Sequence, residues 1–177
     1  MAERHNDSTK QRNRRVLTEI PTAPGAYALI LDIPHELAVP VAGGVRLSSG
    51  QYVYCGSARG PGGIRARVAR HLRAEKTAHW HIDRLHPQDN SIAVICVDGG
   101  TECAMVEAAM RLDGATMPIS GFGASDCANC AAHLIRLPRA TDPKAIADAL
   151  RSEDGAPMLI DKLGTISLRR SSRRASH

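Results

Sequence analysis

Two stretches of the chain have the alternating side-chain pattern of β-strands and are predicted to be neighbours in one sheet. Residues 25–33 read GAYALILDI, and residues 51–57 read QYVYCGS. Successive side chains of a strand point to opposite faces of a sheet. The alternation therefore places Tyr27 on one face with the leucines that follow it, and groups Tyr54 with Gly56. These two strands form the centre of the predicted fold.

The remaining elements follow from apolar spacing and turn residues. Strands and helices are mixed, with too few helices between strands for a parallel, doubly wound sheet. The sequence therefore predicts an α+β fold: a small three-stranded, mainly antiparallel sheet flanked by helices, with an extra hairpin and C-terminal elements. The further predicted segments are a loop or small hairpin over 35–50 with a turn at Gly43-Gly44, a helix over about 64–73, a strand over 91–98, a helix from Thr101 to about Arg111, a short apolar run over 133–137 and a helix over about 143–151.

The chain has 177 residues, of which 43% are hydrophobic, which is enough for one compact domain. We expect a basic mobile arm over 1–18, the main domain over 19–140, a C-terminal helix and extension over 141–166, and a basic disordered tail over 167–177.

Composition excludes several classes of protein. No apolar run approaches the roughly 20 residues of a membrane-spanning helix, and the charged N-terminus lacks the apolar core of a secretory signal. We therefore expect a cytoplasmic protein without membrane contact. Five cysteines argue against a secreted disulfide framework. Aromatic residues make up only 3% of the chain, which disfavours a binder that stacks bases.

The basic side chains are clustered along the chain. Residues 1–15 carry five basic and two acidic side chains, residues 59–76 carry six and one, and residues 168–177 carry four arginines, while the whole chain is only +5. Such clusters are typical of proteins that bind polyanions. The alternative, that the two ends are merely solubilising tails, stays open for those segments.

The helix after Gly63 presents two kinds of basic side chain. At about 100° per residue, Arg67 and His71 lie together at the edge of its apolar stripe. Arg70 and Arg73 lie opposite, where they would meet solvent or a phosphate backbone. The alternatives are an Arg67 that only covers the edge of the core and a His71 that is simply capped or solvated.

The helix after Thr101 offers two carboxylates. Glu102 lies within the apolar stripe and is expected to turn inward, where a divalent cation or a basic cluster would keep it ionised. Glu107 lies on the other side, four residues before Arg111, as in an exposed helical ion pair. The alternative for Glu102 is a solvated side chain that favours the helix N-terminus.

Two further motifs combine groups that bind metals or phosphates. His79, His81 and Asp83 alternate in HWHID, and an extended backbone would point all three to one face. Cys127, Cys130 and His133 have the spacing of zinc ligands, with Cys103 as a possible fourth member. Buried thiols and a core histidine are the alternative for this second group.

These motifs resemble the GIY-YIG nuclease superfamily. The resemblance rests on Gly25-Ala-Tyr27, on Tyr54-Cys-Gly56, and on Arg67 and His71 in the next helix. It is closer to a GIY-YIG-related family that is fused to endonuclease III in some archaea, through the wording GAYALIL, YVYCGSARGPGG, RVARHL, HWHIDRL, ECAM and GFGASDC. HWHID and SDCANCAAH have no counterpart in the better understood nucleases; they substitute for a missing asparagine, bind a second metal, or mark a different activity.

The resemblance implies an endonuclease that cleaves phosphodiesters with one divalent cation, Mg²⁺ or Mn²⁺. Tyr27 and Tyr54 would lie on adjacent strands, with one of them orienting or deprotonating the attacking water. Arg67 would stabilise the phosphoryl oxygens and His71 would assist proton transfer. The metal ligand would be Glu102, although the register of the resemblance also permits Glu107.

The sequence thus predicts a metal-dependent endonuclease of DNA repair or processing, with DNA favoured over RNA. The alternatives are a non-catalytic nucleic-acid-binding module with the same fold and a zinc-stabilised interaction domain. The residues expected to contact nucleic acid are Arg59, Arg65, Arg70, Arg73, His79 and His81.

Overall fold

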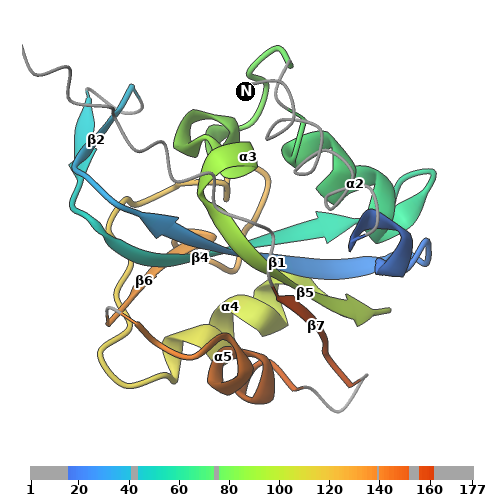
Figure 1. Ribbon diagram of the computed structural model, residues 1–177. Helices are drawn as coiled ribbons and strands as arrows, with labels where there is room; N and C mark the ends of the chain where they lie inside the picture. The colour runs from blue at the N-terminus through green and yellow to red at the C-terminus, as the bar shows by residue number, and fades with distance from the viewer. Residues whose placement is uncertain (1–15, 41–43, 74–75, 139, 152–155, 162–177) are drawn as a thin grey trace, which may run out of the picture.

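The computed structural model describes residues 16–40, 44–73, 76–138, 140–151 and 156–161. Its centre is a five-stranded antiparallel sheet with the strand order β6-β4-β1-β5-β7 (Figure 1). The strands are β1 (Gly25–Ile33), β4 (Gly50–Ala58), β5 (Ser91–Asp98), β6 (Leu134–Leu137) and β7 (Met158–Asp161). The two stretches on which the prediction was centred are thus the middle strand and its neighbour.

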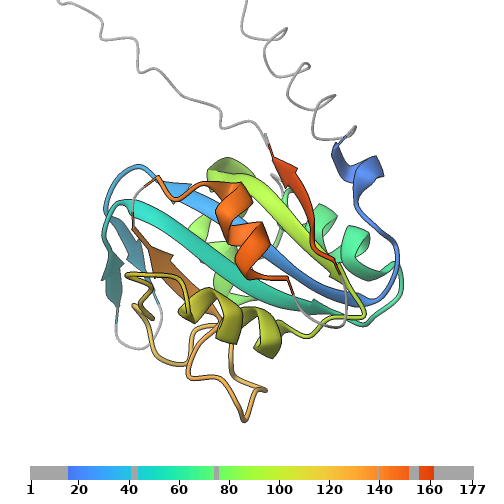
Figure 2. The same cartoon turned by 90° about the horizontal axis from the view of Figure 1, so that it is seen from below.

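Helices cover both faces of the sheet (Figures 1 and 2). One face packs against α2 (Gly63–His71) and the 3-10 helix η1 (His81–Leu85), with the short α3 (Pro87–Asn90) nearby. The other face packs against α4 (Glu102–Met110) and α5 (Pro143–Ala149). The alternation predicted for β1 and β4 is confirmed, because Tyr27 and Tyr54 belong to the first core and Val53 and Cys55 to the second.

The α+β class is therefore confirmed, and the sheet is wider than predicted. The three predicted central strands gain β6 and β7, one on each edge. The loop over 35–50 forms a separate hairpin of β2 (Leu37–Val39) and β3 (Val45–Leu47). Part of its predicted Gly43-Gly44 turn lies outside the described residues.

The helix boundaries agree with local capping. The side chain of Thr101 accepts a hydrogen bond from the backbone N–H of Ala104, so α4 begins where its predicted N-cap places it. Asp142 caps α5 in the same way through Lys144. Within the described segments, no helix combines the length and apolar character needed to cross a membrane.

The predicted terminal segments lie largely outside the described residues. Of the predicted arm over 1–18, only residues 16–18 are described; they belong to a helical turn over 16–19, and Val16 and Leu17 pack against the core. The predicted tail over 167–177 is not among the described residues. The predicted extension over 141–166 contains α5 and β7.

Candidate functional site

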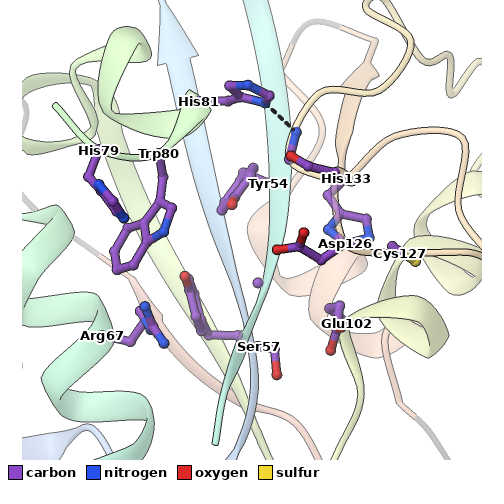
Figure 3. A pocket seen from close by; sticks show the side chains of 14 residues that line it. Tyr54, Ser57, Arg67, His79, Trp80, His81, Glu102, Asp126, Cys127 and His133 are labelled. Atoms are coloured by element: carbon purple, nitrogen blue, oxygen red, sulfur yellow. Dashed lines mark hydrogen bonds between the residues drawn. The ribbon is translucent and has the colours of Figure 1, made fainter. Parts of the chain in front are cut away.

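A pocket of about 340 Å³ opens beside the ends of β1 and β4. In Figure 3, Arg67 and Trp80 lie on one side of it and Glu102, Asp126 and Cys127 on the other, with Tyr54 between them. The pocket therefore draws on both helical layers and on the loop that precedes β6. Its lining consists of Tyr27, Tyr54, Gly56, Ser57, Arg67, His79, Trp80, His81, Glu102, Gly123, Ser125, Asp126, Cys127 and His133.

The two tyrosines are diagonal neighbours on adjacent strands. Tyr27 pairs with Gly56, two residues beyond Tyr54 along β4. The Tyr27 ring lies across the space that a side chain at position 56 would fill, because a Cβ built there overlaps the Tyr27 ring and hydroxyl. The glycine at position 56 therefore gives Tyr27 its place in the pocket wall.

Behind the pocket, Tyr27, His71 and Asp83 form a buried row. The Tyr27 hydroxyl lies 2.7 Å from Nε2 of His71. Burial raises the pKa of Tyr27 well above its usual value, and burial lowers the pKa of His71 to about 4 against the opposing effect of Asp83. The Asp83 carboxylate, whose Oδ1 lies 3.6 Å from Nδ1 of His71, favours the tautomer with the ring proton on Nδ1. In that tautomer the Tyr27 hydroxyl donates to Nε2.

The Asp83 side chain is buried, only 1% exposed, and several hydrogen-bond donors surround its carboxylate. Its Oδ2 accepts hydrogen bonds from the backbone N–H groups of His79 at 3.0 Å and Trp80 at 3.1 Å. Arg70 forms an ion pair with it at 3.1 Å, and Nζ of Lys76 lies 3.7 Å from Oδ1. Burial alone would raise the pKa of Asp83, but these hydrogen bonds and the guanidinium lower it to about 2.

The prediction that His79, His81 and Asp83 share one extended face is wrong for Asp83. Residues 81–85 form the 3-10 helix η1, because the Asp83 carboxylate accepts hydrogen bonds from the backbone N–H groups that precede it. His79 and His81 both line the pocket, whereas Asp83 lies buried behind it. Nδ1 of His81 accepts a hydrogen bond from the backbone N–H of Gly123 at 3.0 Å, which joins η1 to the loop before β6.

Trp80 organises the arginines of α2. The guanidinium of Arg67 lies 4.4 Å from the centre of the Trp80 rings, and that of Arg70 lies 3.8 Å from it. Arg67 lines the pocket and forms no ion pair with any other residue described. The predicted outward placement of Arg70 is wrong, because Asp83 draws it into an ion pair. Arg67 is therefore the cation of α2 that remains available to a ligand.

The two glutamates of α4 separate as the helical projection predicts. Glu102, at the first turn, is half-buried and lines the pocket. Glu107 is exposed and accepts a hydrogen bond from Arg111 at 3.0 Å in the predicted ion pair. Of the two candidates for metal binding, only Glu102 therefore faces the pocket.

The other predicted nucleic-acid contacts are spread around α2. Arg59 and Arg73 are exposed. Arg65 donates to the backbone carbonyls of Ile20 at 2.7 Å and Thr18 at 3.0 Å, so it holds the preceding segment in place. A second, smaller cavity of about 180 Å³ shares Arg67 and Trp80 with the main pocket.

The four predicted zinc ligands also come together. The candidate donor atoms of Cys103, Cys127, Cys130 and His133 all lie within 4.8 Å of one another, so the group could hold a metal ion. All three thiols are free of disulfides. Backbone hydrogen bonding at Asn129 and the His133 ring lower the pKa of Cys127 to about 6. This group is called the Cys3His cluster below.

Sequence reasoning missed two contributors to the pocket. Asp126 lies next to Cys127, and its carboxylate points into the pocket (Figure 3). Trp80 was recognised only as part of HWHID, although two arginines stack on it. The acidic residue in the GFGASDC segment was the available signal for Asp126, but its position depends on a loop without helix or strand.

Replacing Gly56 by alanine tests how the tyrosine is placed. We expect a loss of about 1–3 kcal/mol in the free energy of unfolding, because the added methyl group forces the Tyr27 ring away from His71. Urea unfolding measures the loss. The matched control is Gly60→Ala, where a Cβ meets open space and the change should stay within about 0.5 kcal/mol. Equal stability of the two variants would contradict this packing.

Together the fold and the site define an α+β protein with a polar pocket at the end of its central strands, beside a cluster suited to metal binding. Residues 26–154 match the model of a family described as domain of unknown function DUF123. The chain belongs to this family, which spans more than two thirds of its length. No curated protein and no solved structure matches the chain.

Proposed function

We propose that the protein is a metal-dependent endonuclease, related to the GIY-YIG nucleases, that hydrolyses phosphodiester bonds of nucleic acid, with DNA as the favoured substrate. The observation that carries the proposal is the pocket itself. Tyr27, Tyr54, Arg67 and Glu102 come from four separate elements and line one cavity, with His71 hydrogen-bonded directly behind Tyr27.

The charges around the pocket support a phosphate ligand. Arg67 reaches the cavity from one side while the carboxylates of Glu102 and Asp126 reach it from the other. Within the described part of the chain, neither carboxylate forms an ion pair or hydrogen bond. A phosphodiester with a divalent cation would complement both sides of such a pocket.

The donor set fits a small, hard cation. Mg²⁺ prefers oxygen ligands and is usually bound by one or two carboxylates together with water and substrate phosphate. Glu102 is the proposed ligand, and Asp126 is the second carboxylate within the same cavity. Magnesium or manganese bound there would polarise the phosphate and neutralise charge on the leaving oxygen.

The buried row behind the pocket supports a route for the proton of the attacking water. The water transfers a proton to the Tyr27 oxygen while Tyr27 passes its own proton to Nε2 of His71. The imidazolium that forms lies beside the Asp83 carboxylate. The hydroxide oxygen forms the new bond to phosphorus as the ester P–O bond breaks, and solvent protonates the leaving oxygen.

The proposal is tested by incubating the protein with plasmid, branched DNA and RNA in magnesium or manganese. We expect metal-dependent cleavage that falls about 100-fold or more in Glu102→Gln, because the carboxylate proposed to hold the cation is lost. Glu107→Gln, on the outer side of the same helix, discriminates between the two glutamates and should cleave like the wild type.

Two outcomes would count against the proposal. Salt-sensitive binding of nucleic acid without turnover would identify a non-catalytic binding module instead. Cleavage that is equal in the wild type and in Glu102→Gln would show that the activity comes from another site or from a contaminant.

A further inference from the structure

The Cys3His cluster lies where the beginning of α4 meets the loop before β6. Cys103 belongs to the first turn of α4, and the other three members follow one another over residues 127–133. The sulfur atoms of Cys103 and Cys127 are 3.4 Å apart. Residues separated by more than 20 positions along the chain therefore bring their ligand atoms to one point.

The dimensions of the cluster suit a tetrahedral zinc site. With Zn–S bonds of about 2.3 Å and Zn–N bonds of about 2.0–2.1 Å, tetrahedral ligand atoms lie roughly 3.5–3.8 Å from one another. The ligand atoms of the cluster lie within 4.8 Å of one another, so only a small contraction would close the site. Three thiolates and an imidazole select zinc over magnesium, which prefers oxygen ligands.

His133 is the buried member of the cluster, whose three cysteines are half-buried. Its side chain is buried, and its Nε2 atom has no hydrogen-bond partner among the described residues. A buried polar atom without a partner costs free energy.

The loop that carries three of the ligands has little regular structure of its own. Residues 121–133 contain no helix or strand. Their backbone is held by single hydrogen bonds, such as those from Gly121 to Ala131 at 2.7 Å and from His133 to Phe122 at 2.8 Å. A metal bound by both the loop and α4 would fix one relative to the other.

We propose that the Cys3His cluster binds one structural Zn²⁺, which fastens this loop to the start of α4. Four protein ligands complete a tetrahedral site and leave no open position for substrate. Glu102 precedes one ligand and Asp126 precedes another, so the zinc positions both carboxylates that line the pocket. This inference does not rest on the endonuclease proposal.

The experiment measures metal content in protein purified without chelator. Elemental analysis should find one zinc per chain in the wild type and in the control Cys96→Ala, whose thiol is buried elsewhere in the sheet. Cys127→Ser/Cys130→Ser should lose the zinc. A wild type without stoichiometric zinc, or with a Cys103–Cys127 disulfide in its place, would overturn the proposal.

A second measurement uses only wild-type protein, so it does not depend on whether the double variant folds. Wild-type protein is stripped with a chelator and reloaded with Co²⁺, which reports its ligands in the visible spectrum. Tetrahedral d–d bands with a sulfur-to-cobalt charge-transfer band are expected, and zinc should abolish both as it displaces cobalt. Octahedral cobalt without the charge-transfer band would reject cysteine ligation. Neither measurement uses nuclease activity.

Discussion

Arg67→Ala is expected to lower kcat for phosphodiester cleavage about 10²–10³-fold, the usual effect of removing one preorganised donor from a site of developing negative charge. Arg67 is held over Trp80, 4.4 Å from the centre of its rings, and no carboxylate among the described residues neutralises it. Its charge is therefore in place before substrate binds. Steady-state cleavage of a defined DNA substrate separates the effect on kcat from that on KM.

Two control variants test whether the loss of rate in Arg67→Ala comes from the guanidinium in the pocket. Arg67→Lys keeps the charge but loses the planar fork of donors, so it should recover only part of the rate. Arg111→Ala removes an equal charge from the exposed ion pair with Glu107 and should cleave like the wild type. An unchanged kcat in Arg67→Ala would remove this residue from the proposed chemistry.

Asp83→Ala is expected to lower the free energy of unfolding by about 3–5 kcal/mol, the range for breaking a buried ion pair by removing one partner. The substitution leaves the backbone N–H groups of His79 and Trp80 without their acceptor and Arg70 without its carboxylate. Urea unfolding measures the loss. Asp148→Ala, which breaks an exposed pair with Arg151, should change stability by less than about 1 kcal/mol.

The pH dependence of unfolding checks the same buried row. The pKa of His71 is about 4 in the folded protein and about 6.5 in an unfolded chain. Between these values the unfolded state binds more protons, so wild-type stability falls as the pH drops from 6.5 to 4, by about 3 kcal/mol. His71→Phe should lack this decline. A decline of the same size in that variant would assign it to other groups.

Asp83 adds a second decline at lower pH. Its pKa is about 2 in the folded protein, below the value of about 3.9 in an unfolded chain. The stability that it contributes is therefore present above pH 3.9 and disappears as the pH falls through 2. Asp83→Asn should lose this second phase.

The parts of the site that follow from local periodicity could be predicted from the sequence. Alternation along β1 and β4 places Tyr27 and Tyr54 on one face, and the helical projection turns Glu102 inward and Glu107 outward. The spacing of Cys127, Cys130 and His133 also predicted that these residues share a site, with Cys103 as a possible fourth member. Each of these predictions needs only the geometry of one element or a short ligand motif.

The parts that depend on distant partners could not be predicted. Arg70 turns inward because Asp83, thirteen residues later, is buried next to it. Asp83 in turn leaves the predicted extended face because it accepts hydrogen bonds from its own turn. β7 is four residues long and pairs with β5 more than 60 residues earlier, so no local pattern distinguishes it from a loop.

The outer strands of the sheet have a consequence for how copies of the protein meet. As described, β6 and β7 are four residues long, while the strands that they flank have nine and eight. An edge strand offers its backbone N–H and C=O groups to any other sheet, and a short edge offers few of them. Both edge strands therefore offer few backbone groups for pairing with the sheet of another copy, which disfavours edge-to-edge aggregation. The long apolar strands β1, β4 and β5 lie between them, inside the sheet.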